Sequence, residues 1–197
     1  MPFAVRPYRP GDEQGGLRCR ALSFLGSAYY DDVVPEKPSY DGPTIELVAA
    51  EGPEIVGLID VELEREPGIV CSDREGLGGM IWNIATHPDH QRDGVATALL
   101  NEAERLARAE GIRRFEAWTR DDPHVHEWYS SRGFEIVESY LHVYIELEEG
   151  LRELFPITEE LRPVKLFAHY VGDDRGAVRQ RFRRVHECVL FERRFDA

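Results

Sequence analysis

The chain has 197 residues, of which 42% are hydrophobic and 10% aromatic, a composition typical of a folded, soluble domain rather than a disordered one. Its formal net charge of -13 argues against nonspecific nucleic-acid binding, because the phosphates would be repelled. No apolar run reaches the roughly 20 residues of a membrane span, and the N-terminal sequence MPFAVRPYRPGDE lacks the apolar core of a secretory signal. A cytoplasmic protein without a membrane partner is therefore expected.

The numbers of cysteine and lysine residues say little about the function of the protein. Cys19, Cys71 and Cys188 are odd in number and widely spaced, which indicates buried thiols rather than a disulfide framework or a zinc knuckle. The basic residues are almost all arginine, with lysine at Lys37 and Lys165. Salt-adapted hosts and GC-rich genomes both produce this bias, so a halophilic origin stays open.

The first third of the chain predicts a strand, a helix, a loop and a hairpin. In chain order these elements are a strand at 3–8, a helix at 9–26, an irregular loop at 27–43, and hairpin strands at 44–50 and 54–64. Asp12 is expected to cap the helix. The loop is rich in proline, glycine and aspartate, and loops of this length are often functional, so it is either substrate-facing or simply mobile.

The middle of the chain alternates strands with helices. The predicted elements are a loop at 65–79, a strand buried on both faces at 80–87, a helix at 94–110, a strand at 112–119, a helix at 121–133 and a strand at 134–147. Gly111 is expected to end the helix at 94–110 and Gly133 the helix at 121–133. The order predicts an α/β sandwich with a mixed, mostly antiparallel sheet flanked by helices.

Residues 148–197 are treated as a C-terminal α/β extension of a main domain at 1–147. Helical turns and loop are expected at 148–163, followed by a strand at 164–172, a helix at 173–185 capped by Asp173 or Asp174, and a strand at 186–195. This section is too small for an independent core, so it is expected to dock on the main sheet or complete it.

One turn carries chemistry: the sequence HQRDGVATALL passes from the strand at 80–87 into a helix. A helix N-terminus has unpaired N–H donors and the positive end of a dipole, which suit a phosphate group. Gly94 lets the backbone approach a ligand closely, and Arg92 adds positive charge. The turn lacks the Gly-Lys-Ser/Thr of a P-loop, so by itself it predicts phosphate binding only weakly.

This turn resembles that of the GCN5-related N-acetyltransferase (GNAT) family, in which a strand is followed by Q/R-x-x-G-x-G/A and a helix. The matching positions are Gln91, Arg92, Gly94 and Ala96. The family also carries a tyrosine shortly before a Gly-Phe pair, and EWYSSRGFEIV supplies Tyr129, Gly133 and Phe134. The resemblance covers about residues 44–147; residues 148–197 lie outside the family's common core.

The resemblance implies a GNAT fold, acetyl-CoA as donor co-substrate, a primary amine as acceptor and no metal. The strand end that pairs with the pantetheine arm corresponds to Ile84, Ala85 and Thr86. The turn that holds the pyrophosphate corresponds to Arg92, Asp93, Gly94, Val95, Ala96 and Thr97. Asp122 falls where many members have a cofactor-contacting asparagine. A carboxylate cannot donate a hydrogen bond, so Asp122 either contacts the cofactor differently or caps the helix.

The implied mechanism is direct attack of the amine on the thioester, with Tyr129 as the general acid for the coenzyme A thiolate. A backbone N–H near Ile84 to Thr86 would polarise the carbonyl. The base is undetermined: a water chain is one candidate, and the side-chain candidates are Asp60, Glu62, Glu64, His87 and His142. The HVH sequence at 124–126 does not predict a metal site, because helical residues two apart face different directions.

The sequence leaves two functions from different classes open. The leading one is an acyl-CoA-dependent N-acetyltransferase acting on a small-molecule or peptide amine. The alternative is a non-catalytic acyl-CoA-binding regulatory module with the same fold, which would not need Tyr129. A second copy of the chain, forming a homodimer, is an open partner.

Overall fold

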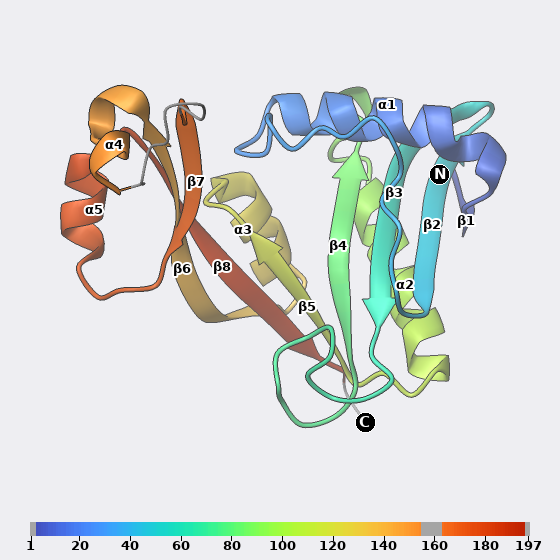
Figure 1. Ribbon diagram of the computed structural model, residues 1–197. Coiled ribbons are helices and arrows are strands. Elements are labelled where there is room, and N and C mark those ends of the chain that lie inside the picture. The colour runs from blue at the N-terminus through green and yellow to red at the C-terminus, as the bar shows by residue number, and fades with distance from the viewer. Residues whose placement is uncertain (1–2, 155–162, 196–197) are drawn as a thin grey trace.

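The structure is a computed structural model that describes residues 3–154 and 163–195 (Figure 1). It contains one eight-stranded sheet in the order β1-β2-β3-β4-β5-β8-β6-β7. The strands are β1 Ala4–Pro7, β2 Thr44–Glu51, β3 Glu54–Leu63, β4 Gly78–Thr86, β5 Arg114–Thr119, β6 Glu135–Glu146, β7 Lys165–Tyr170 and β8 Arg184–Arg194. The helices are α1 Glu13–Leu25, α2 Val95–Ala109, α3 Pro123–Ser131, α4 Leu151–Leu154 and α5 Arg175–Arg181. The expected mixed, mostly antiparallel α/β architecture is confirmed.

Helices α1 and α2 cover opposite faces of the β2–β4 half of the sheet. On α2 the buried positions follow a helical period and are Val95, Leu99, Leu100, Ala103 and Ala107. The helix ends before Gly111, whose φ of 82° is the left-handed conformation expected after a helix C-terminus. Helix α1 buries Cys19 against Leu58 and Ala85. All three cysteines are free and buried, as the sequence predicted.

Two glycines bring the helices close to β3. A Cβ on Gly15 of α1 would lie 2.8 Å from Cγ1 of Ile55. A Cβ on Gly57 of β3 would overlap the side chain of Val95, the first residue of α2. Glycine at both positions therefore sets how near each helix lies to the sheet. The glycine at position 57 lets the N-terminus of α2 lie directly over β3.

Strands β4 and β5 form the one parallel pair of the sheet, and they are paired at one end only. The register joins Gly78, Gly79 and Met80 to Arg114, Phe115 and Glu116. Beyond this point the strands diverge toward α1 (Figure 1). The β3–β4 ladder also shifts register between Asp60 and Val61, which leaves Trp82 as the extra residue of a bulge. Trp82 is 49% exposed, so the expectation that this strand is buried on both faces is wrong at its centre.

The last section of the chain belongs to the same sheet. β8 lies between β5 and β6 and is antiparallel to both, with Trp118 opposite Leu190 and His142 opposite His186. β7 is the edge strand beyond β6. Helix α5 is shorter than expected because Phe182 adopts an extended conformation and packs against the outer face of β6. The residues expected to be helical turns and loop at 155–162 lie outside the described residues.

The N-terminal cap of helix α1 differs from the one expected, whereas the cap of α5 agrees with the expectation. Asp12 precedes α1, but its carboxylate binds the Arg6 guanidinium at 2.6 and 2.7 Å instead of the helix amides. At α5, Asp174 accepts the Ala177 N–H at 2.9 Å, which settles the choice between Asp173 and Asp174.

Within the described part of the chain, no helix is long and apolar enough to cross a membrane.

Candidate active site

The divergence of β4 from β5 leaves a row of β4 backbone groups without a neighbouring strand on that side. Ile84, Ala85 and Thr86 form the end of this row, and β3 pairs with them on the other side through Ile59, Leu58 and Gly57. An unpaired strand edge offers alternating N–H and C=O groups to an extended ligand. The last carbonyl of the row is already engaged, since the Ser23 hydroxyl of α1 donates to the Thr86 carbonyl at 2.7 Å.

The turn before α2 has an open, strained backbone. Arg92 has a φ of 67° and Gly94 a φ of 83°, and Arg92 is the one non-glycine residue with positive φ in the described part of the chain. No atom lies within 4 Å of the position that a Gly94 Cβ would take. Arg92, Asp93 and Gly94 are all exposed. A non-glycine residue held in this region costs about 1 to 2 kcal/mol, and such strain is often found at ligand sites.

The first turn of α2 has donors without an intrahelical acceptor. The helical ladder begins where the Ala98 N–H donates to the Gly94 carbonyl at 2.9 Å. The N–H groups of Val95, Ala96 and Thr97 precede it, and Gly94 has no side chain to cap them. The turn therefore presents several N–H groups and a helix dipole to one exposed surface, an arrangement suited to an anion.

Tyr129 lies on α3 and is almost completely buried, with 3% of its surface exposed. Its ring stacks on Phe191 of β8 at a centroid distance of 5.0 Å and meets Phe134 edge-on at 5.1 Å. Burial raises the pKa of the Tyr129 phenol above its ordinary value. Among the described residues its hydroxyl has no hydrogen-bond partner, so the proton of the neutral phenol is free to be donated.

Asp122 precedes α3 but does not cap it. Neither carboxylate oxygen bonds to the first turn of α3. Instead, both accept the Ala28 N–H, at 3.0 and 3.2 Å. Of the two alternatives for Asp122, the helix cap is therefore wrong, and the side chain ties the start of α3 to the loop that follows α1.

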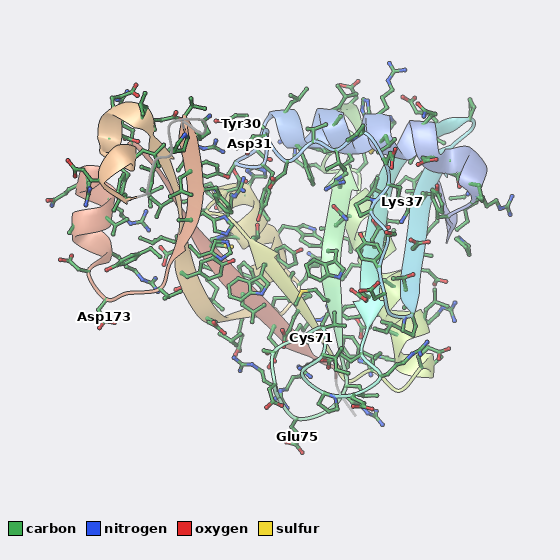
Figure 2. All side chains as sticks on the ribbon, in the orientation of Figure 1. Tyr30, Asp31, Lys37, Cys71, Glu75 and Asp173 are labelled. Atoms are coloured by element: carbon green, nitrogen blue, oxygen red, sulfur yellow. The ribbon has the colours of Figure 1, made fainter. Side chains whose placement is uncertain are left out.

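Arg120, directly after β5, holds the same loop in place, a role that no sequence motif indicated. Its backbone N–H donates to the Tyr29 hydroxyl at 2.8 Å, and its guanidinium donates to the Asp31 carboxylate at 3.4 Å. Arg184 of β8 binds Asp31 at 2.7 and 3.0 Å. Tyr30 and Asp31 lie at the end of the loop that faces β6–β8 (Figure 2). The loop thus bridges the two diverging halves of the sheet.

Each of the five residues considered as bases accepts at least one hydrogen bond within the fold. Glu62 accepts the Trp82 indole N–H and the Gly42 N–H, both at 2.8 Å, and Glu64 accepts four backbone N–H groups of the 65–78 segment. The His87 ring accepts the Asp89 N–H at 3.3 Å. His142 accepts from Arg120 at 3.0 Å, and burial lowers its pKa to about 4.

Asp60 is the fifth candidate, and it lies opposite Asn83 of β4. Its carboxylate accepts the Tyr40 hydroxyl at 3.2 Å and the Asn83 amide at 3.3 Å, and it lies 3.5 Å from the Lys37 ammonium. Burial raises the pKa of Asp60 despite the nearby Lys37 charge. Asn83 is the residue before Ile84, so this carboxylate lies beside β4 on the side where β3 pairs with it.

No cluster of potential metal ligands occurs within residues 3–154 and 163–195.

In the comparisons with known proteins, a model of the acetyltransferase (GNAT) family matches residues 18–134, more than half of the chain. No curated protein sequence matches it.

Several solved structures share the fold. The ribosomal-protein-S18-alanine N-acetyltransferase from Escherichia coli superposes with a TM-score of 0.60 and 10% identity, covering 99% of this chain and 95% of that one. Ard1 from Thermoplasma volcanium gives 0.58 and 15%, with both chains fully covered. The PaiA N-acetyltransferase from Thermoplasma acidophilum, in complex with coenzyme A, gives 0.56 and 12%, covering 99% of this chain and 100% of that one. At such low sequence identities, the similarity to these structures shows a shared fold alone.

Proposed function

Because the chain belongs to the GNAT family of acetyltransferases, we propose that it transfers an acetyl group from acetyl-CoA to a primary amine. The observation that carries this proposal is the open edge of β4 beside the exposed, uncapped first turn of α2. One arrangement offers both an extended site for a pantetheine arm and a site for its pyrophosphate. The coenzyme A complex of the PaiA structure supports the choice of donor.

In this proposal the donor lies along Ile84, Ala85 and Thr86, and its pyrophosphate binds the amides of residues 92–97. Arg92 contributes positive charge at the surface of the turn. A β4 backbone N–H donates to the thioester oxygen and stabilises the negative charge that develops there during attack. Asp122 holds the loop after α1, since its two oxygens share the Ala28 N–H.

The proposed reaction is a direct attack. The amine lone pair forms a bond to the thioester carbonyl carbon, the carbon–sulfur bond breaks, and the thiolate takes the proton of the Tyr129 phenol. The raised pKa of Tyr129 keeps this proton in place at neutral pH. The acceptor must lose its own proton, and we assign that step to the Asp60 carboxylate, whose raised pKa suits a general base. A water chain is the alternative route for this proton.

The test is steady-state release of thiol from acetyl-CoA across a panel of primary amines. Tyr129→Phe is expected to lower kcat about 100-fold or more, the usual size of a general-acid contribution, with little change in the KM for acetyl-CoA. Tyr170→Phe is the matched control, because it removes a tyrosine hydroxyl on the edge strand β7. Asp60→Asn is expected to remove the acidic limb of the pH–rate profile.

The same measurements separate the enzyme from a non-catalytic acyl-CoA-binding module. Binding of acetyl-CoA without turnover of any amine would favour the binding module. Failure to bind acetyl-CoA would contradict both functions.

A further inference from the structure

A small cavity lies between α1 and the β2–β3 strands. Its polar lining residues are Tyr8, Glu13, Arg20, Lys37 and Asp60, and the remainder of the wall is apolar. The volume is about 30 Å³, enough for two or so waters or one carboxylate group, since a water needs roughly 10 to 15 Å³ on this measure. Lys37 lies on the loop that crosses in front of β3, and its side chain forms part of the cavity wall on that side (Figure 2).

Arg20 is the unusual member of this cavity. Its Nε and Nη1 atoms are buried, and neither has a hydrogen-bond partner among the described residues. The guanidinium lies 5.1 Å from the centre of the Phe24 ring, which satisfies none of its N–H donors. Leaving buried donors of a charged group unpaired is costly. Consistent with this, burial lowers the pKa of Arg20 below its ordinary value.

The other charges around the cavity are already engaged. The Lys37 ammonium binds the Glu46 carboxylate and lies 3.5 Å from that of Asp60. Glu13 accepts the backbone N–H of Lys37 at 3.5 Å. No carboxylate of the described residues comes within ion-pair distance of Arg20, although the charges of Asp60 and Asp32 favour its charged form. Arg20 is therefore the cation of this cavity that lacks an anionic partner.

The cavity also includes the proposed general base. Asp60, in its wall, accepts the amide of Asn83, which directly precedes the open β4 edge at Ile84. On the other side of Arg20, Ser23 of the same helix binds the Thr86 carbonyl at the end of that edge. The Asp60 carboxylate and the Arg20 guanidinium both line this cavity, so a molecule bound in it meets the two groups together.

We propose that Arg20 binds a carboxylate of the acceptor, so that the acceptor is an amine that also carries a carboxylate. The carboxylate takes the place beside Nε and Nη1 of Arg20, and the amine lies on the side of Asp60 and Asn83. A planar guanidinium can bind a carboxylate through two parallel hydrogen bonds, which the unpaired Nε and Nη1 donors permit. This inference rests on the proposed acetyltransferase function, because it names the acceptor class for the same site.

The experiment compares matched amines that differ only in the carboxylate: free amino acids and their carboxamides. Thermal-shift titrations measure binding in the presence of coenzyme A, and thiol release from acetyl-CoA measures turnover. Arg20→Gln and Arg20→Met remove the guanidinium. Arg18→Gln is the control, because it removes one exposed arginine from the same helix. All variants are first checked for wild-type circular dichroism and coenzyme A binding.

We expect at least one amino acid to bind and react while its carboxamide does so at least about tenfold more weakly, as loss of a charged hydrogen bond implies. The Arg20 variants should abolish this preference, and Arg18→Gln should retain it. Equal binding of acids and amides, an unchanged preference in the Arg20 variants, or binding of no amino acid would each overturn the inference. Arg20-dependent binding without thiol release would instead contradict the proposed acetyl transfer and leave the carboxylate site standing.

Discussion

Asp122 accepts the backbone N–H of Ala28 through both carboxylate oxygens, at 3.0 and 3.2 Å. This contact joins two segments separated by 94 positions in the sequence: the loop after α1 and the start of α3. Tyr129 lies on α3, and the loop carries Tyr29, whose hydroxyl accepts the Arg120 N–H. Asp122 therefore helps to fix the relative positions of the proposed acid and the loop above the β4–β5 divergence.

Replacing Asp122 tests this contact. Asp122→Ala leaves the partly buried Ala28 N–H unpaired and is expected to reduce the free energy of unfolding by about 1 to 3 kcal/mol. Hydrogen exchange at Ala28 should accelerate. Asp122→Asn keeps a carbonyl oxygen that can accept the same N–H, so its exchange should stay near that of the wild type. Equal exchange at Ala28 in Asp122→Ala and the wild type would show that the contact does not hold the loop.

Gly94 provides a test of the turn before α2. Its φ is 83°, and a Cβ there would meet open space, so Gly94→Ala adds backbone strain of about 1 kcal/mol without a clash. If the turn binds the donor pyrophosphate, the KM for acetyl-CoA should rise severalfold, because the added methyl group lies on the ligand side. Gly111→Ala is the matched control: its φ is 82°, it has equally open surroundings, and it lies at the opposite end of α2.

The two variants should lose similar stability in chemical denaturation, and the rise in KM should be confined to Gly94→Ala. A similar KM change in both would mean that strain in α2, not contact at the turn, is responsible.

Gly57 controls how closely α2 approaches β3. Gly57→Ala places a methyl group against Val95 and the Leu99 side chain, and overpacking of this kind costs about 1 to 3 kcal/mol. Adding Val95→Ala should recover part of that loss by making room for the new methyl group. A double-mutant cycle in urea measures the coupling, and purely additive effects would contradict the packing explanation.

His142 gives a pH prediction. Burial is the main cause that lowers its pKa, from the ordinary 6.5 to about 4, and the charge of Arg120 adds to it. The imidazole of His142 therefore binds a proton more tightly in the unfolded chain than in the folded one. The contribution of neutral His142 to the free energy of unfolding is complete above about pH 6.5 and is lost progressively as the pH falls toward 4. His142→Gln should flatten the dependence of unfolding free energy on pH in this window.

The exposed His124 supplies the control, and His124→Gln should leave the pH dependence unchanged. Urea denaturation at several pH values between 4 and 6.5 makes the measurement. The assignment to His142 would be wrong if both variants kept the wild-type slope.

Local sequence determined the secondary structure and the family of this protein. The helical period of Val95, Leu99 and Ala103, and the turn residues at both ends of α2, predict that helix because their causes are local. The spacing of Gly94 and Tyr129 within the two motifs is likewise a property of the sequence. The GNAT resemblance drawn from them is confirmed by the family match over residues 18–134.

Tertiary structure alone decided how distant segments meet. The position of β8 between β5 and β6 depends on which strand faces pack together, and no local pattern in residues 184–194 specifies those neighbours. The hydrogen bond from the Ala28 N–H to Asp122 stands in place of the helix cap that was one alternative from the sequence, because a loop N–H from far along the chain lies within reach. The unpaired state of Arg20 depends equally on folding: an arginine on a helix ordinarily reaches solvent, and only the packing of α1 against β3 buries its donors.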